Sequence, residues 1–141
     1  MSDLTIFLYH GVCSAESSGI ENFSRKHIDV DTFRDHMAVA RKTGTPLTMD
    51  EVSAHIENGQ QFRENAFAVT FDDGFENNFS VAAPVLDDLG IPATFYFSTG
   101  FVESERMFWV DEIEDCINRT TEPAIDLSAV DPRLPDAFPL G

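Results

Sequence analysis

The sequence has few cysteines and few basic residues. Its two cysteines, Cys13 and Cys116, lie far apart among 141 residues and form no Cys-x-x-Cys pair. This spacing supports neither a redox motif nor a zinc knuckle, and two cysteines do not define a disulfide scaffold. Lys and Arg number 9 against 25 Asp and Glu, which gives a formal net charge of −16. Such a charge repels phosphate backbones and anionic membrane surfaces, which argues against nucleic acid or lipid headgroups as partners.

Long hydrophobic runs and targeting signals are absent as well. No stretch approaches the length of a membrane span, and the first residues, Met1–Leu4, lack the basic region of a signal peptide. We therefore expect a cytoplasmic protein with no membrane span. The acidic balance is typical of a well-solvated surface, and it also suits a metal cation or a neutral or amine-bearing substrate.

Hydrophobic residues make up 43% of the chain and include 13 Phe, enough for the packed core of one domain. Apolar runs rich in β-branched and aromatic residues predict strands near residues 4–9, 66–71 and 92–97. Strands alternate with helical patterns, and the two later strands are apolar on both faces. This order predicts an α/β fold with parallel strands. Prolines are frequent after residue 120, so we expect an irregular tail over residues 120–141.

Four segments have helical periodicity. The first is predicted to be capped by Asp29 or Asp31 and to end before Gly44, and the second opens with a Thr48–Glu51 capping box and closes near Gly59. A third segment runs to Gly90. It is predicted to kink or restart at Pro84, so that Pro84 lies in the first turn of the second piece. The apolar stripe of the last helix is predicted to face inward, with Cys116 as a small core residue; it comprises Trp109, Ile113, Cys116 and Ile117.

Polar residues stand at the carboxyl end of each predicted strand, namely Tyr9-His10, Asp72-Asp73 and Ser98-Thr99. Active sites of parallel α/β sheets form at the carboxyl ends of the strands, so these residues would line one rim if the strands are neighbours.

Asp72-Asp73 is the most informative of these pairs. One carboxylate can bind a metal while the other takes a proton from water, and Gly74 would let both face one pocket. Asp-Asp-Gly is also a turn sequence, in which Asp73 could merely cap the following helix. His10 could be a ligand, a base or a hydrogen-bonded structural residue. The other histidines are assigned to the surface, namely His27, His36 and His55.

These residues also carry a family resemblance. Val69–Phe75, followed by Asn77-Asn78 and Ala83–Leu86, resembles the first motif and next helix of polysaccharide deacetylases, the NodB-homology family. Three further segments are similar to the family in the same order. Leu8–Val12 resembles its opening strand, Gly90–Gly100 resembles its next strand, and Phe108–Asp111 resembles an insertion found in one branch of the family. The agreement covers roughly residues 4–117.

The resemblance implies an irregular (β/α) barrel and metal-dependent hydrolysis of acetyl groups, through a non-peptide C–N bond, on N-acetylated oligo- or polysaccharides. Within this motif Asp72 matches the catalytic base, and Asp73 matches a ligand of the divalent metal, usually zinc. Candidate site-lining residues are Tyr9, His10, Thr70, Gly74 and Thr99. We expect one truncated deacetylase domain over residues 1–141, with its NodB-like core starting near residue 65.

The sequence also departs from the family. The His-[Ser/Thr]-x-x-His pair that completes the metal site is absent, and so are the later elements that include the acid histidine. We therefore expect little activity from these 141 residues alone. The chain would be a fragment, the product of a disrupted reading frame, or half of a split protein completed by a second chain.

Other protein classes stay open as alternatives. A non-catalytic saccharide-binding or degenerate module would keep the cleft without the chemistry. A receiver-like phosphoacceptor domain requires an Asp at the end of the third strand, but this strand ends in Phe97–Gly100. A haloacid-dehalogenase-type phosphatase would want Asp-x-Asp spacing, which this motif lacks. The sugar, the metal and the choice between N- and O-acetyl groups are left open.

Overall fold

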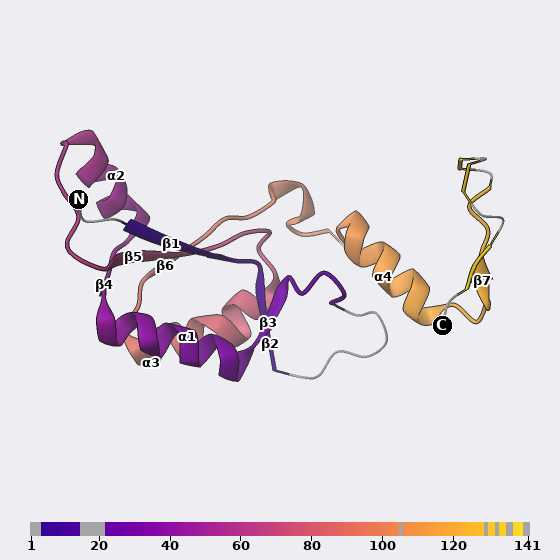
Figure 1. The fold of residues 1–141 in the computed structure, drawn as a ribbon, viewed down its shortest axis with the longest axis horizontal. Coiled ribbons are helices and arrows are strands. Elements are labelled where there is room, and N and C mark those ends of the chain that lie inside the picture. Colours follow the sequence, from indigo (N-terminus) through magenta and orange to yellow (C-terminus); the bar gives the residue numbers. More distant parts are fainter. Residues whose placement is uncertain are drawn as a thin grey trace. The chain divides into compact units, whose positions relative to one another are not determined.

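The computed structural model describes residues 4–14, 22–104, 106–128, 130–131, 133–134 and 137–139. The chain divides into two compact units (Figure 1). Unit 1 comprises residues 1–16 and 24–105, and unit 2 comprises residues 17–23 and 106–141.

The centre of unit 1 is a parallel sheet built around strand β5 (Ala66–Phe71). Strand β1 (Leu4–Tyr9) pairs with β5 over its whole length. Two short strands pair with the other side of β5. Strand β4 (Thr45–Pro46) pairs with the first two residues of β5, and strand β6 (Ala93–Phe95) pairs with the last three residues of β5. Strand β5 is therefore the central strand, and all six of its residues are buried.

Helices cover one face of this sheet. Helix α1 (Val30–Thr43) and helix α3 (Ala83–Leu89) lie on the same side of β1, β5 and β6 (Figure 1). Alternate residues of β5 point into the core between the sheet and the helices, where they meet fully or nearly fully buried helix side chains. This core includes Phe67, Val69 and Phe71 of β5, Phe33 and Met37 of α1, and Val85 and Leu86 of α3. Burial of these apolar side chains drives the docking of the helices.

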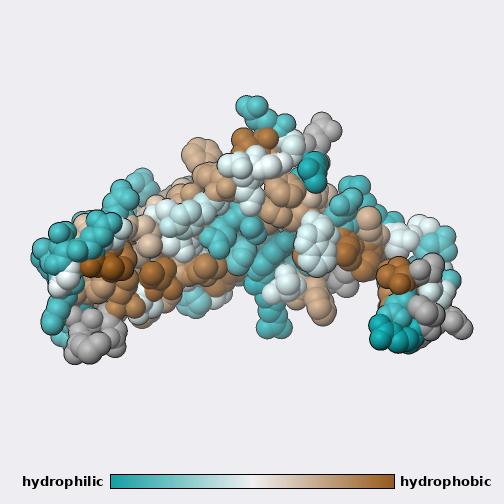
Figure 2. All heavy atoms as spheres, turned by 90° about the horizontal axis from the view of Figure 1, so that it is seen from above, coloured by the Kyte–Doolittle hydropathy of each residue, from teal (hydrophilic) through white to brown (hydrophobic). Residues whose placement is uncertain are grey.

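Residues of β1 alternate between the two faces of the sheet. Phe7 and Tyr9 pack against the helix-covered core. Ile6 and Leu8 point to the opposite face and are 46% and 56% exposed, and hydrophobic side chains are visible on the surface seen from above (Figure 2). The sheet therefore has one covered and one partly uncovered apolar face.

Helix boundaries follow the predicted signals. Asp29 caps α1 by accepting hydrogen bonds from the backbone N–H groups of Asp31 and Thr32, each at 3.0 Å. Helix α2 (Met49–Glu57) opens with the complete Thr48–Glu51 capping box.

The helical segment after β5 has two pieces. A π-helical turn, η1 (Asn78–Ala82), precedes α3, whose second residue is Pro84. The restart predicted at Pro84 is confirmed, since a proline without an N–H group is tolerated in a first turn. Gly90 ends α3 in the left-handed conformation, with φ at 61°.

Other predictions of local structure were incomplete. Strand β6 spans three residues instead of residues 92–97, because its partner β5 ends at Phe71, opposite Phe95. Strands β2 (Gly11–Cys13) and β3 (His27–Asp29), which the sequence patterns do not predict, pair in parallel at the two ends of a segment, residues 13–24, whose Ser, Glu and Gly content is typical of a loop. The part of that loop over residues 15–21 lies outside the described residues.

Unit 2 contains α4 (Trp109–Arg119) and a two-stranded antiparallel pair, β7 (Ala124–Ile125) and β8 (Phe138–Pro139). The tail is therefore not wholly irregular. The predicted inward stripe of α4 is wrong for the described residues: Trp109 is 71% exposed, and Cys116 is exposed instead of buried in a core. The reason is that the described part of unit 2 has no second layer large enough to cover the stripe. None of the described helices has the length and apolarity to span a membrane.

Candidate active site

The carboxyl end of β5 is where the acidic motif leaves the sheet. The N–H group of Asp72 donates to the carbonyl oxygen of Tyr9 at 2.9 Å, and the N–H group of Tyr96 donates to the carbonyl oxygen of Phe71 at 2.8 Å. Hydrogen bonds thus tie the last residues of β1, β5 and β6 together. Because the three strands are parallel neighbours, their carboxyl ends share one rim of the sheet.

Directly after β5 the backbone makes a very tight turn. The N–H group of Gly74 donates to the carbonyl oxygen of Asp72 at 2.9 Å, which closes a three-residue γ-turn around Asp73. Asp73 and Gly74 both have positive φ, at 72° and 77°. This conformation is strained for a residue with a side chain, although Asp tolerates it better than most residues do.

Phe97 leaves no space for a side chain at Gly74. A Cβ atom there would collide with the Phe97 ring, although 62% of Phe97 is exposed. Glycine is therefore required at position 74 for two reasons, its backbone conformation and the close approach of this ring. The acidic turn is held between β1 on one side and the continuation of β6 on the other.

Asp72 and Asp73 are both half-buried at this turn. Within the part of the chain that the structure describes, neither carboxylate forms a hydrogen bond or an ion pair with another side chain. Two adjacent acceptor groups with no donor beside them can take a cation or a proton from a substrate or water molecule.

The other predicted site residues differ in where their side chains lie. The Tyr9 ring packs on the helix side, 5.0 Å from the Phe33 ring and 5.6 Å from the Phe71 ring between centroids. Its hydroxyl lies 3.4 Å from Nδ1 of His36, and burial raises the pKa of Tyr9 above its usual value. Tyr9 therefore meets the acidic turn through its backbone carbonyl, and its ring belongs to the core.

Thr70, His10 and Thr99 surround the turn less directly. The Thr70 hydroxyl is buried and donates to the carbonyl oxygen of Phe7 at 3.4 Å, which links β5 to β1. His10 is half-buried at the end of β1, and Thr99 is exposed at the start of a 3-10 turn, η2 (Thr99–Phe101). Roles for these three side chains in binding or catalysis stay predictions.

A cluster of side chains that the sequence does not predict forms around the residues directly after the turn. His27 Nδ1 lies 3.0 Å from Nδ2 of Asn77, and the His27 ring meets the Phe75 ring edge-on, with centroids 4.7 Å apart. Lys26 Nζ lies 5.2 Å from the centroid of the same Phe75 ring, a cation–π contact. His27 was assigned to the surface because no metal-ligand spacing involves it, and nothing in its local sequence indicated this contact.

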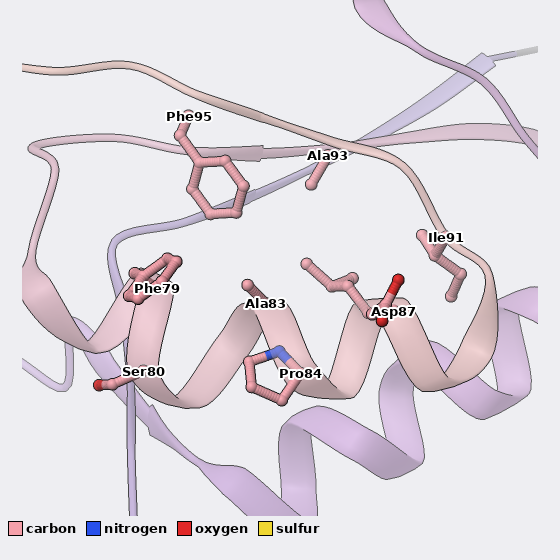
Figure 3. A pocket seen from close by; sticks show the side chains of 9 residues that line it. Phe79, Ser80, Ala83, Pro84, Asp87, Ile91, Ala93 and Phe95 are labelled. Atoms are coloured by element: carbon pink, nitrogen blue, oxygen red, sulfur yellow. The ribbon is translucent and has the colours of Figure 1, made fainter.

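An apolar groove of about 640 Å³ lies between α3 and the edge of β6 (Figure 3). Its only acidic side chain is Asp87, and the motif residues take no part in it. It is lined by Phe79, Ser80, Ala83, Pro84, Leu86, Asp87, Ile91, Ala93 and Phe95. The groove is therefore separate from the acidic turn.

Comparison with known proteins assigns this arrangement to a family. Residues 59–126, which include β5, the acidic turn and α3, match the polysaccharide deacetylase family. Residues 59–126 therefore resemble part of a polysaccharide deacetylase domain. Over 94 residues it is 30% identical to "Putative polysaccharide deacetylase YxkH" from Bacillus subtilis (strain 168), an alignment that covers 66% of this chain and 31% of the relative.

Solved structures show the same fold for the deacetylase domain. IcaB from Ammonifex degensii matches with a TM-score of 0.62 at 24% identity, over 77% of this chain and 43% of that one. The deacetylase PplD from Streptococcus pyogenes, solved in complex with acetate, matches with a TM-score of 0.61 at 20% identity, over 79% and 50%. The chain thus spans half or less of the length of these relatives. The α/β fold class, a partial (β/α) barrel of the deacetylase type, is confirmed.

The described residues do not form a complete metal site. Among the described residues, no three His, Cys, Asp or Glu side chains converge in a way that could hold a metal ion. A catalytic zinc ion normally takes three protein ligands. Asp73 could supply one of them, but no group of three such side chains that includes Asp73 occurs among the described residues.

Proposed function

We propose that this chain carries the acidic motif of a metal-dependent polysaccharide deacetylase that acts on N-acetylated saccharides. Asp72 is the catalytic base and Asp73 is a metal ligand. The observation that supports this proposal best is the γ-turn at the carboxyl end of the central strand, which presents two half-buried carboxylates with no side-chain partner in the described chain. The family match over residues 59–126 supplies the reaction class.

The reaction is the hydrolysis of an acetamide. A water oxygen attacks the acetyl carbonyl carbon and Asp72 takes a proton from that water, which raises its nucleophilicity. The C–N bond then breaks, acetate leaves, and the sugar nitrogen takes a proton to become an amine. The proton donor for this last step and the remaining metal ligands are assigned to none of the described residues.

The net charge of the chain agrees with this product. An amine is protonated near neutral pH, and a surface with a formal charge of −16 attracts a cationic sugar polymer over long distances. The Phe97 ring, exposed beside Gly74, adds an apolar surface of the kind that borders ligand sites.

Acetate release from N-acetylglucosamine oligomers by the intact protein tests the proposal. Asp72→Asn should lower kcat by about 10²–10⁴-fold, because a base of this kind typically contributes that much. A chelator and Asp73→Asn should each abolish turnover. Asp50→Asn is the matched control, since it makes the same chemical change on α2, away from the motif, and should leave kcat unchanged.

The 141-residue chain alone should release no measurable acetate, because one carboxylate is a weak zinc site. Turnover by this chain that both a chelator and Asp72→Asn abolish would contradict that expectation. A non-catalytic saccharide-binding module is the second candidate. Such a module would bind the oligomers without metal, and Asp73→Ala would not change its affinity for them. The intact protein would then release no acetate.

A further inference from the structure

His27 lies between the two chain segments that leave the rim of the sheet. One is the continuation of β1 through His10 into β2, and the other is the continuation of β5 through the acidic turn into η1. His27 pairs with Gly11 of the first segment in the β2–β3 ladder. It contacts Phe75 and Asn77 of the second segment, directly after Gly74.

The fit of the His27 ring against the first segment is very close. A Cβ atom on Gly11 would collide with the His27 ring and would lie 2.8 Å from Oδ1 of Asn77. The N–H group of Gly11 also donates to the carbonyl oxygen of Lys26 at 3.3 Å. The imidazole therefore fills the space between the two segments and sets their separation.

The contacts with the second segment restrain it in two different ways. The hydrogen bond at Nδ1 of His27 orients the Asn77 amide, whose Oδ1 atom is buried without another partner in the described chain. The edge-on contact with Phe75 holds the residue next to Gly74, and Lys26 lies over the same ring. Since Phe75 is only two residues from Asp73, a shift of this ring would move the turn that carries both carboxylates.

We propose that His27 is a positioning residue for the acidic motif, acting through Phe75 and Asn77 on the orientation of Asp72 and Asp73. This inference rests on the proposed function for its effect on catalysis. Its effect on the geometry of the turn holds whether or not the protein is a deacetylase. The two effects can therefore be measured separately.

Three substitutions in the intact protein separate the two restraints. His27→Asn keeps a hydrogen-bonding atom near the place of Nδ1 and removes the ring. His27→Phe keeps a ring against Phe75 and removes the hydrogen bond, and His27→Ala removes both. His55→Ala is the matched control, because His55 is also half-buried and stacks on a phenylalanine, Phe62, at 5.2 Å, on α2 away from the motif.

The first measurement is the pair of backbone amide NMR shifts of Asp73 and Gly74. His27→Ala should move both signals, His27→Asn and His27→Phe should move them less, and His55→Ala should leave them in place. The second measurement is acetate release. His27→Ala should lower kcat by about 10–100-fold, the usual loss when a group that orients a catalytic residue is removed, with KM within about twofold of the unmodified protein. His27→Asn should recover part of the loss.

Each outcome decides the proposal. Unmoved Asp73 and Gly74 signals in His27→Ala overturn it, and so does an equal fall in kcat for His27→Ala and His55→Ala at a temperature where both are folded. If His27→Ala does not fold, His27→Asn and His27→Phe provide the same comparison. If the unmodified protein releases no acetate but the turn signals move, the positioning role holds and the proposed deacetylase function fails.

Discussion

Helices α1 and α4 have the same kind of sequence and different surroundings. Each has an apolar stripe at helical spacing and at least one acidic residue in its first turn. Helix α1 buries Phe33 and Met37 completely against the sheet of unit 1. No residue of α4 is buried, and Trp109 and Ile113 are 71% and 49% exposed. Periodicity thus predicts which face of a helix is apolar, but it does not predict whether another part of the molecule covers that face.

The two helices also differ in their polar contacts. The first turn of α1 is fixed by the Asp29 cap, whereas the residue before α4 makes no side-chain capping hydrogen bond. In unit 2 the carboxylate of Glu114 accepts from the backbone N–H group of Asn22 at 3.0 Å, and Arg119 pairs with Asp115 at 3.0 Å. An exposed ion pair of this kind contributes little to stability. Unit 2, as described, depends on weaker interactions than the core around α1.

Core truncation should show the largest difference between the two helices. Phe33→Ala should lower the free energy of unfolding by about 3–5 kcal/mol, because it opens a cavity beside Phe71 and Tyr9. Trp109→Ala should change it by no more than about 0.5 kcal/mol, as for most exposed positions. Urea denaturation of both variants measures this. Equal losses would mean that a part of the molecule outside the described residues covers α4.

Removal of the cap should have a smaller effect. Asp29→Ala should cost about 1 kcal/mol, since the N–H groups of Asp31 and Thr32 lose their acceptor. Asp29→Asn retains an acceptor oxygen and should cost much less. Circular dichroism during denaturation measures both variants. A loss for Asp29→Asn as large as that for Asp29→Ala would show that charge, and not capping, is what α1 needs there.

The smallest predicted effect is a pH dependence of the same core. Burial raises the pKa of Tyr9 in the folded protein. The folded state therefore favours the neutral phenol. The contribution of the neutral Tyr9 phenol to stability is complete below the pKa of the unfolded state, about 10. This contribution is lost as the pH rises from there through the pKa of the folded state. Tyr9→Phe should remove this alkaline loss, which thermal denaturation between neutral and high pH can detect. An unchanged pH dependence in Tyr9→Phe would place its origin elsewhere.

Local signals made much of the fold predictable. The ends of β1 and β5, the Thr48–Glu51 capping box and the restart at Pro84 all depend on residues that are close in sequence. The order of strands and helices then indicated a parallel sheet, because each crossover between parallel strands needs a helix-length connection.

Contacts between distant segments could not be predicted in the same way. The length of β6 depends on where its partner β5 ends, and the exposure of Cys116 depends on what lies opposite α4. At the site, the sequence located Asp72 and Asp73 at a strand end, but the contact of His27 with Asn77 spans 50 residues and has no local pattern. The positive φ of Asp73 was likewise hidden, since Asp is common in turns of every type.

The close approach of Gly11 to the His27 ring has a consequence for the evolution of this protein. A side chain at position 11 and an imidazole at position 27 compete for the same space. The two positions should therefore change together among related proteins, with alanine or a larger residue at position 11 accompanied by a smaller residue at position 27. In the laboratory, Gly11→Ala should be harmful alone and be partly rescued by His27→Ala, a non-additive pair that links the two strands leaving the rim.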